Sequence, residues 1–333
     1  MATRRQFLSF TAGTACSAAA LSLVPLAACS QDAPAPATPA AARPTSDAPA
    51  TAATRTAAVG AVLKRAIPAS GEPLPVIGVG TSGSYEVGLE TPGFAALQAV
   101  VKTFFDGGGT VIDTSPNYSN AEDVVGALLA QGGWRERCFL ATKLAADDQA
   151  ALEAQWAASK RRLQTTKVEL LQVHNLRNMA QAWPYARRLK EAGETRYIGL
   201  THYVERGHAE LAALMRRETP DFVQVNYSVA APQAARSIFP LAQDLGIAVI
   251  VNRAFDDGKL FARTGDRPLP GWAAEAGITS WAQAFLKFAV SHPAVTVVIP
   301  ATGKPERQAD NLKGGTGALL TQAQQDELVA LFA

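Results

Sequence analysis

The chain has 333 residues, and 48% of them are hydrophobic, which is enough to bury the core of one large domain. Its formal net charge is only +2 and no block of Lys or Arg follows the N-terminus, so there is no electrostatic basis for binding nucleic acid. Cys16 and Cys29 fall in the N-terminal segment, which leaves Cys138 alone and excludes a disulfide framework in the globular part.

Residues 1–29 have the pattern of an export signal, with a basic start, an apolar stretch and small residues at the end. Arg4 and Arg5 are followed by Gln6, Phe7 and Leu8, a run that resembles the twin-arginine signal. The resemblance implies the twin-arginine export machinery as a partner. An ordinary secretory signal with two coincidental arginines is the alternative.

The segment Leu26-Ala27-Ala28-Cys29 resembles a bacterial lipobox, in which the Cys is lipidated after cleavage. Lipidation of Cys29 would anchor the protein to a membrane on the periplasmic side. Plain cleavage and an uncleaved membrane anchor are the alternatives. Residues 30–60 are mostly Ala, Pro, Thr and Ser and cannot bury a core, so they predict a disordered, extended linker.

From residue 61 to the C-terminus, short apolar runs alternate with helix-length segments. Residues 62–80 predict a hairpin that leads into a first strand. The runs are rich in Val, Ile and Leu, as expected for parallel strands covered on both faces, and they span 75–80, 110–113, 138–143, 169–174, 196–201, 222–227, 247–253 and 295–300. The predicted helices span 92–108, 121–133, 147–164, 182–193, 205–218, 232–246, 279–292 and 305–315, with one more at 320–333.

This alternation predicts an α/β fold, a (β/α)8 TIM barrel over residues 61–333 with an N-terminal β-hairpin and an extra C-terminal helix. An open, doubly wound sheet is the alternative. No GxGxxG loop follows the first strand, which counts against the dinucleotide-binding form of such a sheet. In a barrel of this kind, the chemistry takes place at the carboxyl ends of the strands.

Four residues stand where that chemistry is expected. Asp113, Lys143 and His174 end the second, third and fourth predicted strands, and Tyr118 follows Asp113 by five residues. A Lys ammonium stabilises a phenolate and lowers the pKa of a nearby Tyr, while a carboxylate keeps the Lys charged and oriented. An imidazole can hydrogen-bond a substrate oxygen. The set predicts a proton donor for a carbonyl oxygen that receives a hydride.

Each of the four has an ordinary structural explanation when taken alone, such as a helix cap, a surface Lys or a packed ring. Their occurrence together at successive strand ends favours catalysis. No His/Cys cluster has metal-ligand spacing, so no metal is expected. A barrel hydrolase would need paired carboxylates in the pocket. Glu122 and Asp123 are better explained as the acidic first turn of a helix.

With these residues in place, the sequence from residue 62 to 333 resembles the aldo-keto reductase family. The family's Asp-Tyr-Lys-His tetrad matches Asp113, Tyr118, Lys143 and His174 within similar flanking sequences. The resemblance implies NADPH as the cofactor and an aldehyde or ketone as the small-molecule substrate, reduced to an alcohol. Tyr118 would supply the proton.

The resemblance also implies a set of cofactor-binding residues. The segment IPATGKPERQADN is similar to the family segment that grips the 2′-phosphate of NADPH, and a phosphate dianion favours cations at a helix N-terminus. The residues implied along the chain are Gly80, Thr81, Asp113, Thr201, His202, Gln224, Asn252, Arg253, Phe255, Thr302, Lys304, Arg307 and Asn311.

Some of these positions depart from the family pattern. Many members have Ser-Asn where this chain has Thr201-His202, so the contact with the nicotinamide amide must be partly remade. Many have a stacking aromatic ring where this chain has Asn252. A second function stays open, an exported barrel that binds NADP(H) or a partner protein and senses redox state with little turnover. The intact tetrad argues against it, whereas the scarcity of NADPH outside the cytoplasm argues for it.

Overall fold

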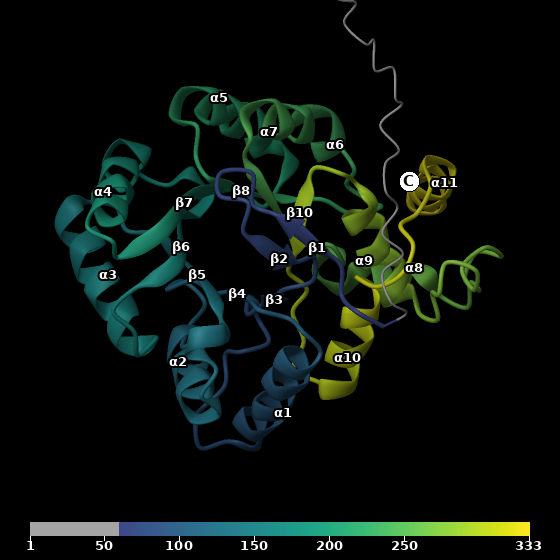
Figure 1. Ribbon diagram of the computed structural model, residues 1–333, viewed down its shortest axis with the longest axis horizontal. Coiled ribbons are helices and arrows are strands. Elements are labelled where there is room, and N and C mark those ends of the chain that lie inside the picture. The colour runs from purple at the N-terminus through teal and green to yellow at the C-terminus, as the bar shows by residue number, and fades with distance from the viewer. Residues whose placement is uncertain (1–59) are drawn as a thin grey trace, which may run out of the picture. The chain divides into compact units, whose positions relative to one another are not determined.

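A computed structural model describes residues 60–333 of the chain (Figure 1). The predicted twin-arginine signal, the lipobox with Cys29 and nearly all of the predicted linker lie outside the described residues. Within 60–333 no helix is both long and apolar enough to cross a membrane.

Eight parallel strands form the wall of a barrel, in the spatial order β10-β9-β8-β7-β6-β5-β4-β3. Each strand overlaps one of the predicted apolar runs, so the predicted (β/α)8 barrel is confirmed. The strands are β3 (Val79–Gly80), β4 (Val111–Asp113), β5 (Phe139–Leu144), β6 (Val168–Val173), β7 (Thr195–Thr201), β8 (Phe222–Asn226), β9 (Ala248–Asn252) and β10 (Val295–Val298).

The barrel closes between its first and last strands. Ile77, just before β3, bridges in parallel to Val298 of β10, and the Gly80 amide donates to the Pro300 carbonyl over 3.1 Å. A Cβ at Gly80 would stand 2.7 Å from the Ile299 carbonyl oxygen, closer than real Cβ contacts. Close approach of the two strands therefore requires a glycine at position 80.

The predicted N-terminal hairpin consists of β1 (Lys64–Ala66) and β2 (Pro73–Pro75), which pair antiparallel and lie across the barrel centre in Figure 1. Ile67 and Leu74 of this hairpin pack in one apolar cluster with residues that point into the barrel, such as Phe139 and Phe222. Arg65 of β1 donates to the carbonyls of Val290 and His292 over 2.6 Å each and so holds the hairpin against the barrel. The hairpin therefore covers the barrel interior with apolar side chains.

Helices form an outer layer around the strands in Figure 1. In α1, apolar residues recur every three or four positions and are buried, as an amphipathic helix requires. The helices are α1 (Pro92–Asp106), α2 (Ala121–Gly132), α3 (Gln149–Arg162), α4 (Met179–Glu191), α5 (His208–Glu218), α6 (Ala234–Ser237), α7 (Phe239–Leu245), α8 (Lys259–Thr264), α9 (Trp281–Ser291), α10 (Pro305–Lys313) and α11 (Gln322–Phe332).

Two helical regions differ from the predicted ones. The segment 232–246 is two helices, α6 and α7. Pro240 lies in the first turn of α7, and because it has no amide hydrogen to donate to a preceding carbonyl, α6 does not continue through it. The short helix α8 was not predicted, since the segment 259–264 is too brief to show a periodic pattern. The last predicted helix is confirmed as α11, which begins with a capping box between Thr321 and Gln324.

Glu122 lies in the first turn of α2, as predicted, and its carboxylate is buried. It accepts hydrogen bonds from Thr142 of β5 over 2.7 Å and from Ser159 of α3 over 3.0 Å, and Arg162 lies 3.2 Å away. These contacts join α2, β5 and α3. Glu122 therefore supports the scaffold beside the site and has its acceptor oxygens fully engaged.

Candidate active site

The strand register brings the predicted tetrad to one rim of the barrel. Asp113 is the last residue of β4, Lys143 lies one residue before the end of β5, and His174 directly follows β6. Lys143 is in register with Gln172 of the neighbouring strand. Because parallel strands share one direction, the side chains at these ends project from the same end of the barrel.

A buried ion pair joins two of the four residues. The Lys143 ammonium lies 2.5 Å from Oδ1 of Asp113, and the two side chains are 0% and 2% exposed. The ammonium also donates to the Thr114 carbonyl over 2.7 Å. Oδ2 of Asp113 accepts from Gln172 over 2.9 Å and from Gln224 over 3.0 Å. Both carboxylate oxygens are thus paired, which a buried charge requires.

The pair fixes the charge on Lys143. Burial lowers the pKa of the ammonium, but the charges and hydrogen bonds of Asp113 and Tyr118 outweigh burial, so the pKa of Lys143 lies above its ordinary value. Lys143 is therefore a cation at neutral pH, held without contact with bulk water.

Tyr118 comes from the turn between β4 and α2. Its amide donates to the Ser115 carbonyl over 3.1 Å, and its carbonyl accepts from the Ala121 amide over 2.8 Å. The Lys143 ammonium lies 5.1 Å from the centre of the Tyr118 ring. The His174 ring meets Tyr118 edge to face, with centroids 5.8 Å apart. The turn therefore brings the phenol to the other three members of the tetrad.

The net pKa direction at Tyr118 differs from the expected one. Burial raises the pKa of the phenol, and the Lys143 ammonium lowers it by less, so the pKa lies above its ordinary value. Tyr118 therefore holds its proton throughout the neutral range. For a group that gives a proton to substrate, this is the required starting state.

His174 is an uncharged ring. Burial and the positive charges of Lys143 and Arg177 lower the pKa of His174 to about 3. The chain after it is strained, since Asn175 and Leu176 adopt positive φ values of 52° and 57°. The Asn175 amide donates to the Thr201 hydroxyl over 2.9 Å, which holds this turn in place.

Two residues of this site were missed from the sequence. Gln172 bonds the Asp113 carboxylate, and the Ser115 hydroxyl lies 3.1 Å from Nδ1 of His174. The alternation of a strand was the available signal for Gln172, because it shares a face of β6 with His174, two residues later. Ser115 lies in a turn, where no periodic pattern could point to it.

Several residues implied as cofactor contacts surround Asp113. Thr81 is fully buried and donates to the Asp113 carbonyl over 3.1 Å. Gln224 bonds the carboxylate, and the Asn252 amide group donates to the Gln224 side-chain oxygen over 3.4 Å. The structure therefore gathers Thr81, Gln224 and Asn252 with the tetrad.

Others are engaged in holding loops. The Thr201 hydroxyl bridges Asn175 and the Val173 carbonyl. The His202 ring lies against Gly207, where a Cβ would stand 2.3 Å from ring atoms. Arg253 lies 3.1 Å from Asp256 and 2.5 Å from Asp257, and it donates to the carbonyl of Tyr203. The Phe255 ring packs against Phe261 and Phe285.

A second group lies at the start of α10. Lys304 is the N-cap, Thr302 accepts from the Lys304 amide over 3.2 Å, and Arg307 is in the first turn. Lys304 and Arg307 are exposed, and neither forms an ion pair within residues 60–333. Asn311 is buried one turn further on. Two cations without an ion pair in residues 60–333, at the N-terminal end of a helix, suit a phosphate.

Comparison with known proteins decides the family. The model of the aldo/keto reductase family matches residues 76–331. The chain belongs to the aldo/keto reductase family. It is therefore an oxidoreductase of that family, as the sequence resemblance predicted. An aldo-keto reductase from Mycolicibacterium smegmatis is 30% identical over 248 residues, which cover 72% of this chain and 81% of that protein.

Solved aldo-keto reductases share the fold. One from Klebsiella pneumoniae, in complex with NADP and acetate, is 25% identical with a TM-score of 0.65, and the match covers 79% of this chain and 93% of that one. One from Bacillus halodurans, in its holo form, is 20% identical with a TM-score of 0.66, covering 81% and 96%. Because the Bacillus halodurans protein is only 20% identical, its similarity supports the barrel fold alone.

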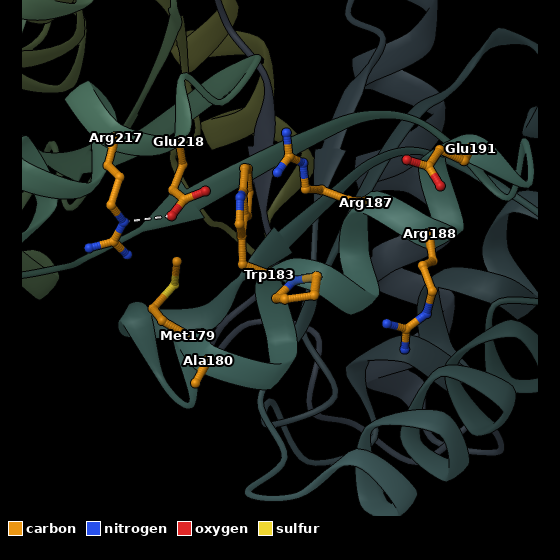
Figure 2. Close-up of a pocket in the computed structure, with 9 residues that line it drawn as sticks. Met179, Ala180, Trp183, Arg187, Arg188, Glu191, Arg217 and Glu218 are labelled. Atoms are coloured by element: carbon orange, nitrogen blue, oxygen red, sulfur yellow. Dashed lines mark hydrogen bonds and ion pairs between the residues drawn. The ribbon is translucent and has the colours of Figure 1, made fainter. Parts of the chain in front are cut away.

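This aldo/keto reductase also has a cavity of about 760 Å³ away from the tetrad, between α4 and α5. Figure 2 shows Trp183 between Arg187 and the Arg217–Glu218 pair, whose charged atoms are 2.7 Å apart. No residue of the tetrad lines this cavity. The strand ends, rather than this groove on the outer layer, carry the groups suited to the family's chemistry.

Proposed function

We propose that the protein reduces an aldehyde or ketone to an alcohol with NADPH, and that Tyr118 is the proton donor. The observation that carries the proposal is the buried Asp113–Lys143 pair beside a protonated Tyr118 and a neutral His174. When bound, NADPH supplies the hydride that the carbonyl carbon receives.

The four residues then divide the work of one proton transfer. Tyr118 gives its proton to the carbonyl oxygen and becomes a phenolate. The Lys143 ammonium stabilises that phenolate, since opposite charges at this burial interact strongly. Asp113 keeps the ammonium charged and in place through the 2.5 Å contact. His174 is neutral and donates a hydrogen bond that orients the carbonyl.

The residues present suit NADPH better than NADH. Lys304 and Arg307 form no ion pair within residues 60–333 and lie at the start of α10, where a phosphate group would meet two cations and the positive end of a helix. The Klebsiella pneumoniae relative, solved with NADP, supports the same cofactor. Lys304, Arg307 and Thr302 would hold the 2′-phosphate end, and Gln224 with Asn252 would lie nearer the nicotinamide.

We also propose that the protein is exported by the twin-arginine machinery and anchored through a lipid on Cys29, on the periplasmic side. The motifs at Arg4-Arg5 and Leu26–Cys29 support this. Twin-arginine export carries folded proteins, so the cofactor could be loaded before export.

Replacing Tyr118 by Phe removes the proton donor but no charge. We expect the rate of carbonyl reduction to fall by at least about 100-fold, because a positioned acid contributes a factor of about 10² to 10⁴. NADPH affinity should not change. The measurement is NADPH oxidation with a panel of aldehydes, ketones and quinones. Tyr85→Phe is the matched control, since that buried hydroxyl has no partner in residues 60–333. Near-normal turnover by Tyr118→Phe would exclude the mechanism.

Replacing Arg307 by Ala tests the phosphate contact. We expect NADPH binding to weaken about 10- to 100-fold, as for a lost charge-assisted hydrogen bond, and NADH binding to change little. Fluorescence titration measures both affinities, and Arg187→Ala on α4 is the control. Equal weakening for both cofactors would show that Arg307 does not contact the 2′-phosphate.

Replacing Cys29 by Ala tests the anchor. We expect the protein to move from the membrane fraction to the soluble periplasmic fraction, because the acylated residue is gone. Immunoblotting of the fractions measures this. Unchanged membrane association would reject lipidation at Cys29, and it would leave the proposed reaction untouched.

A further inference from the structure

We propose that Ser115 is a positioning residue that fixes the tautomer of His174: its hydroxyl donates to Nδ1 and keeps the ring proton on Nε2. The proposal rests on the proposed reduction only for its consequence, a correctly directed hydrogen bond to the carbonyl oxygen.

The contact itself is enclosed. The Ser115 hydroxyl oxygen lies 3.1 Å from Nδ1 of His174, and Ser115 is fully buried. The amide of Asn117 donates to the same hydroxyl oxygen over 3.2 Å. One of the two acceptor lone pairs of Ser115 is thus used by a backbone amide two residues along the turn, and its single hydroxyl hydrogen still needs an acceptor.

Hydrogen-bond counting then selects one tautomer. If Nδ1 of His174 carried the proton, Ser115 would accept from both Nδ1 and the Asn117 amide. Its own hydroxyl hydrogen would then have no acceptor among the described residues, at a cost that buried polar groups rarely bear. If Ser115 donates to Nδ1, every group in the contact has a partner. The proton of the ring is then on Nε2.

The position of the His174 ring proton matters because the ring is neutral and lies beside Tyr118. The ring is neutral, since burial and the cations Lys143 and Arg177 hold the pKa of His174 at about 3. It therefore has a single N–H. The edge-to-face contact with Tyr118 fixes the ring beside the proton donor. No hydrogen bond within residues 60–333 occupies Nε2, so this nitrogen is free to meet substrate.

The tautomer decides whether His174 donates a hydrogen bond to the substrate or faces it with a lone pair. With the proton on Nε2, His174 donates to the carbonyl oxygen that Tyr118 protonates. With the other tautomer, the Nε2 lone pair would face the lone pairs of that oxygen and repel it. Ser115 therefore acts on the reaction through His174, without touching the substrate.

Nitrogen NMR reads the tautomer directly. The chain has only four histidines, so long-range correlation spectra of ¹⁵N-histidine-labelled protein are simple, and His174→Gln assigns the signal. We expect a protonated Nε2 in the wild type and in Ser115→Thr, which keeps the hydroxyl. In Ser115→Ala we expect both tautomers. A wild-type proton on Nδ1 would overturn the proposal.

Kinetics complete the test. We expect Ser115→Ala to lower kcat/KM for the carbonyl about tenfold, the value of one hydrogen bond, with unchanged NADPH affinity. Ser115→Thr should restore the rate. Ser159→Ala, which removes an equally buried hydroxyl bonded to Glu122, should change neither tautomer nor rate.

A loss of rate without a change of tautomer would overturn the proposal. A changed tautomer with an unchanged rate would confirm that Ser115 fixes the tautomer and overturn its consequence for the reaction. If Ser115→Ala does not fold, the wild-type spectrum and the Ser115→Thr variant still decide the tautomer. The spectra need neither substrate nor NADPH, so they separate this proposal from a failure of the proposed reduction.

Discussion

The site depends on one interaction, the ion pair between Asp113 and Lys143 inside the barrel rim. Two charges this far from water are tolerated only when each has further partners. Gln172 and Gln224 supply them to the carboxylate, and the Thr114 carbonyl supplies one to the ammonium. These partners come from β6, β8 and the turn after β4, so the pair requires the closed barrel.

The same burial sets the protonation states around the pair. It raises the pKa of Tyr118 more than Lys143 lowers it, and it lowers the pKa of His174 to about 3. The resting site is therefore a phenol and a neutral imidazole beside a fixed cation. This combination suits the proposed reaction, in which the phenol gives a proton to an oxygen that gains negative charge and the cation stabilises the phenolate left behind.

Much of the fold and the positions of the catalytic candidates were predictable from the sequence. Buried parallel strands have a plain apolar pattern, and barrels place their chemistry at the carboxyl ends of the strands. Asp113, Lys143 and His174 follow from those two rules alone. Glu122 shows a limit, since the sequence places it in the first turn of a helix but does not reveal the tertiary contacts with Thr142 and Ser159 that bury it. The pKa of Tyr118 shows a second limit. Burial raises this pKa and the Lys143 ammonium lowers it, and which effect is larger depends on packing that the sequence does not show.

The residues that hold the loops were the least predictable. Thr201 and Arg253 have hydroxyl or guanidinium groups suited to a cofactor, yet they bond the turns after β6 and β9. Ser115 gave no pattern at all. Side-chain partners across loops depend on backbone turns with positive φ, such as those at Asn175 and Arg253, which local sequence does not specify well.

The most direct test of the central claim removes the ion pair without leaving a lone buried charge. The double variant Asp113→Asn/Lys143→Met keeps the size of both side chains, and its unfolding and NADPH affinity serve as controls. Single-turnover reduction of an aldehyde by the NADPH-loaded protein should then slow by at least about 100-fold, because no cation stabilises the Tyr118 phenolate. A rate within about twofold of the wild type would contradict the account.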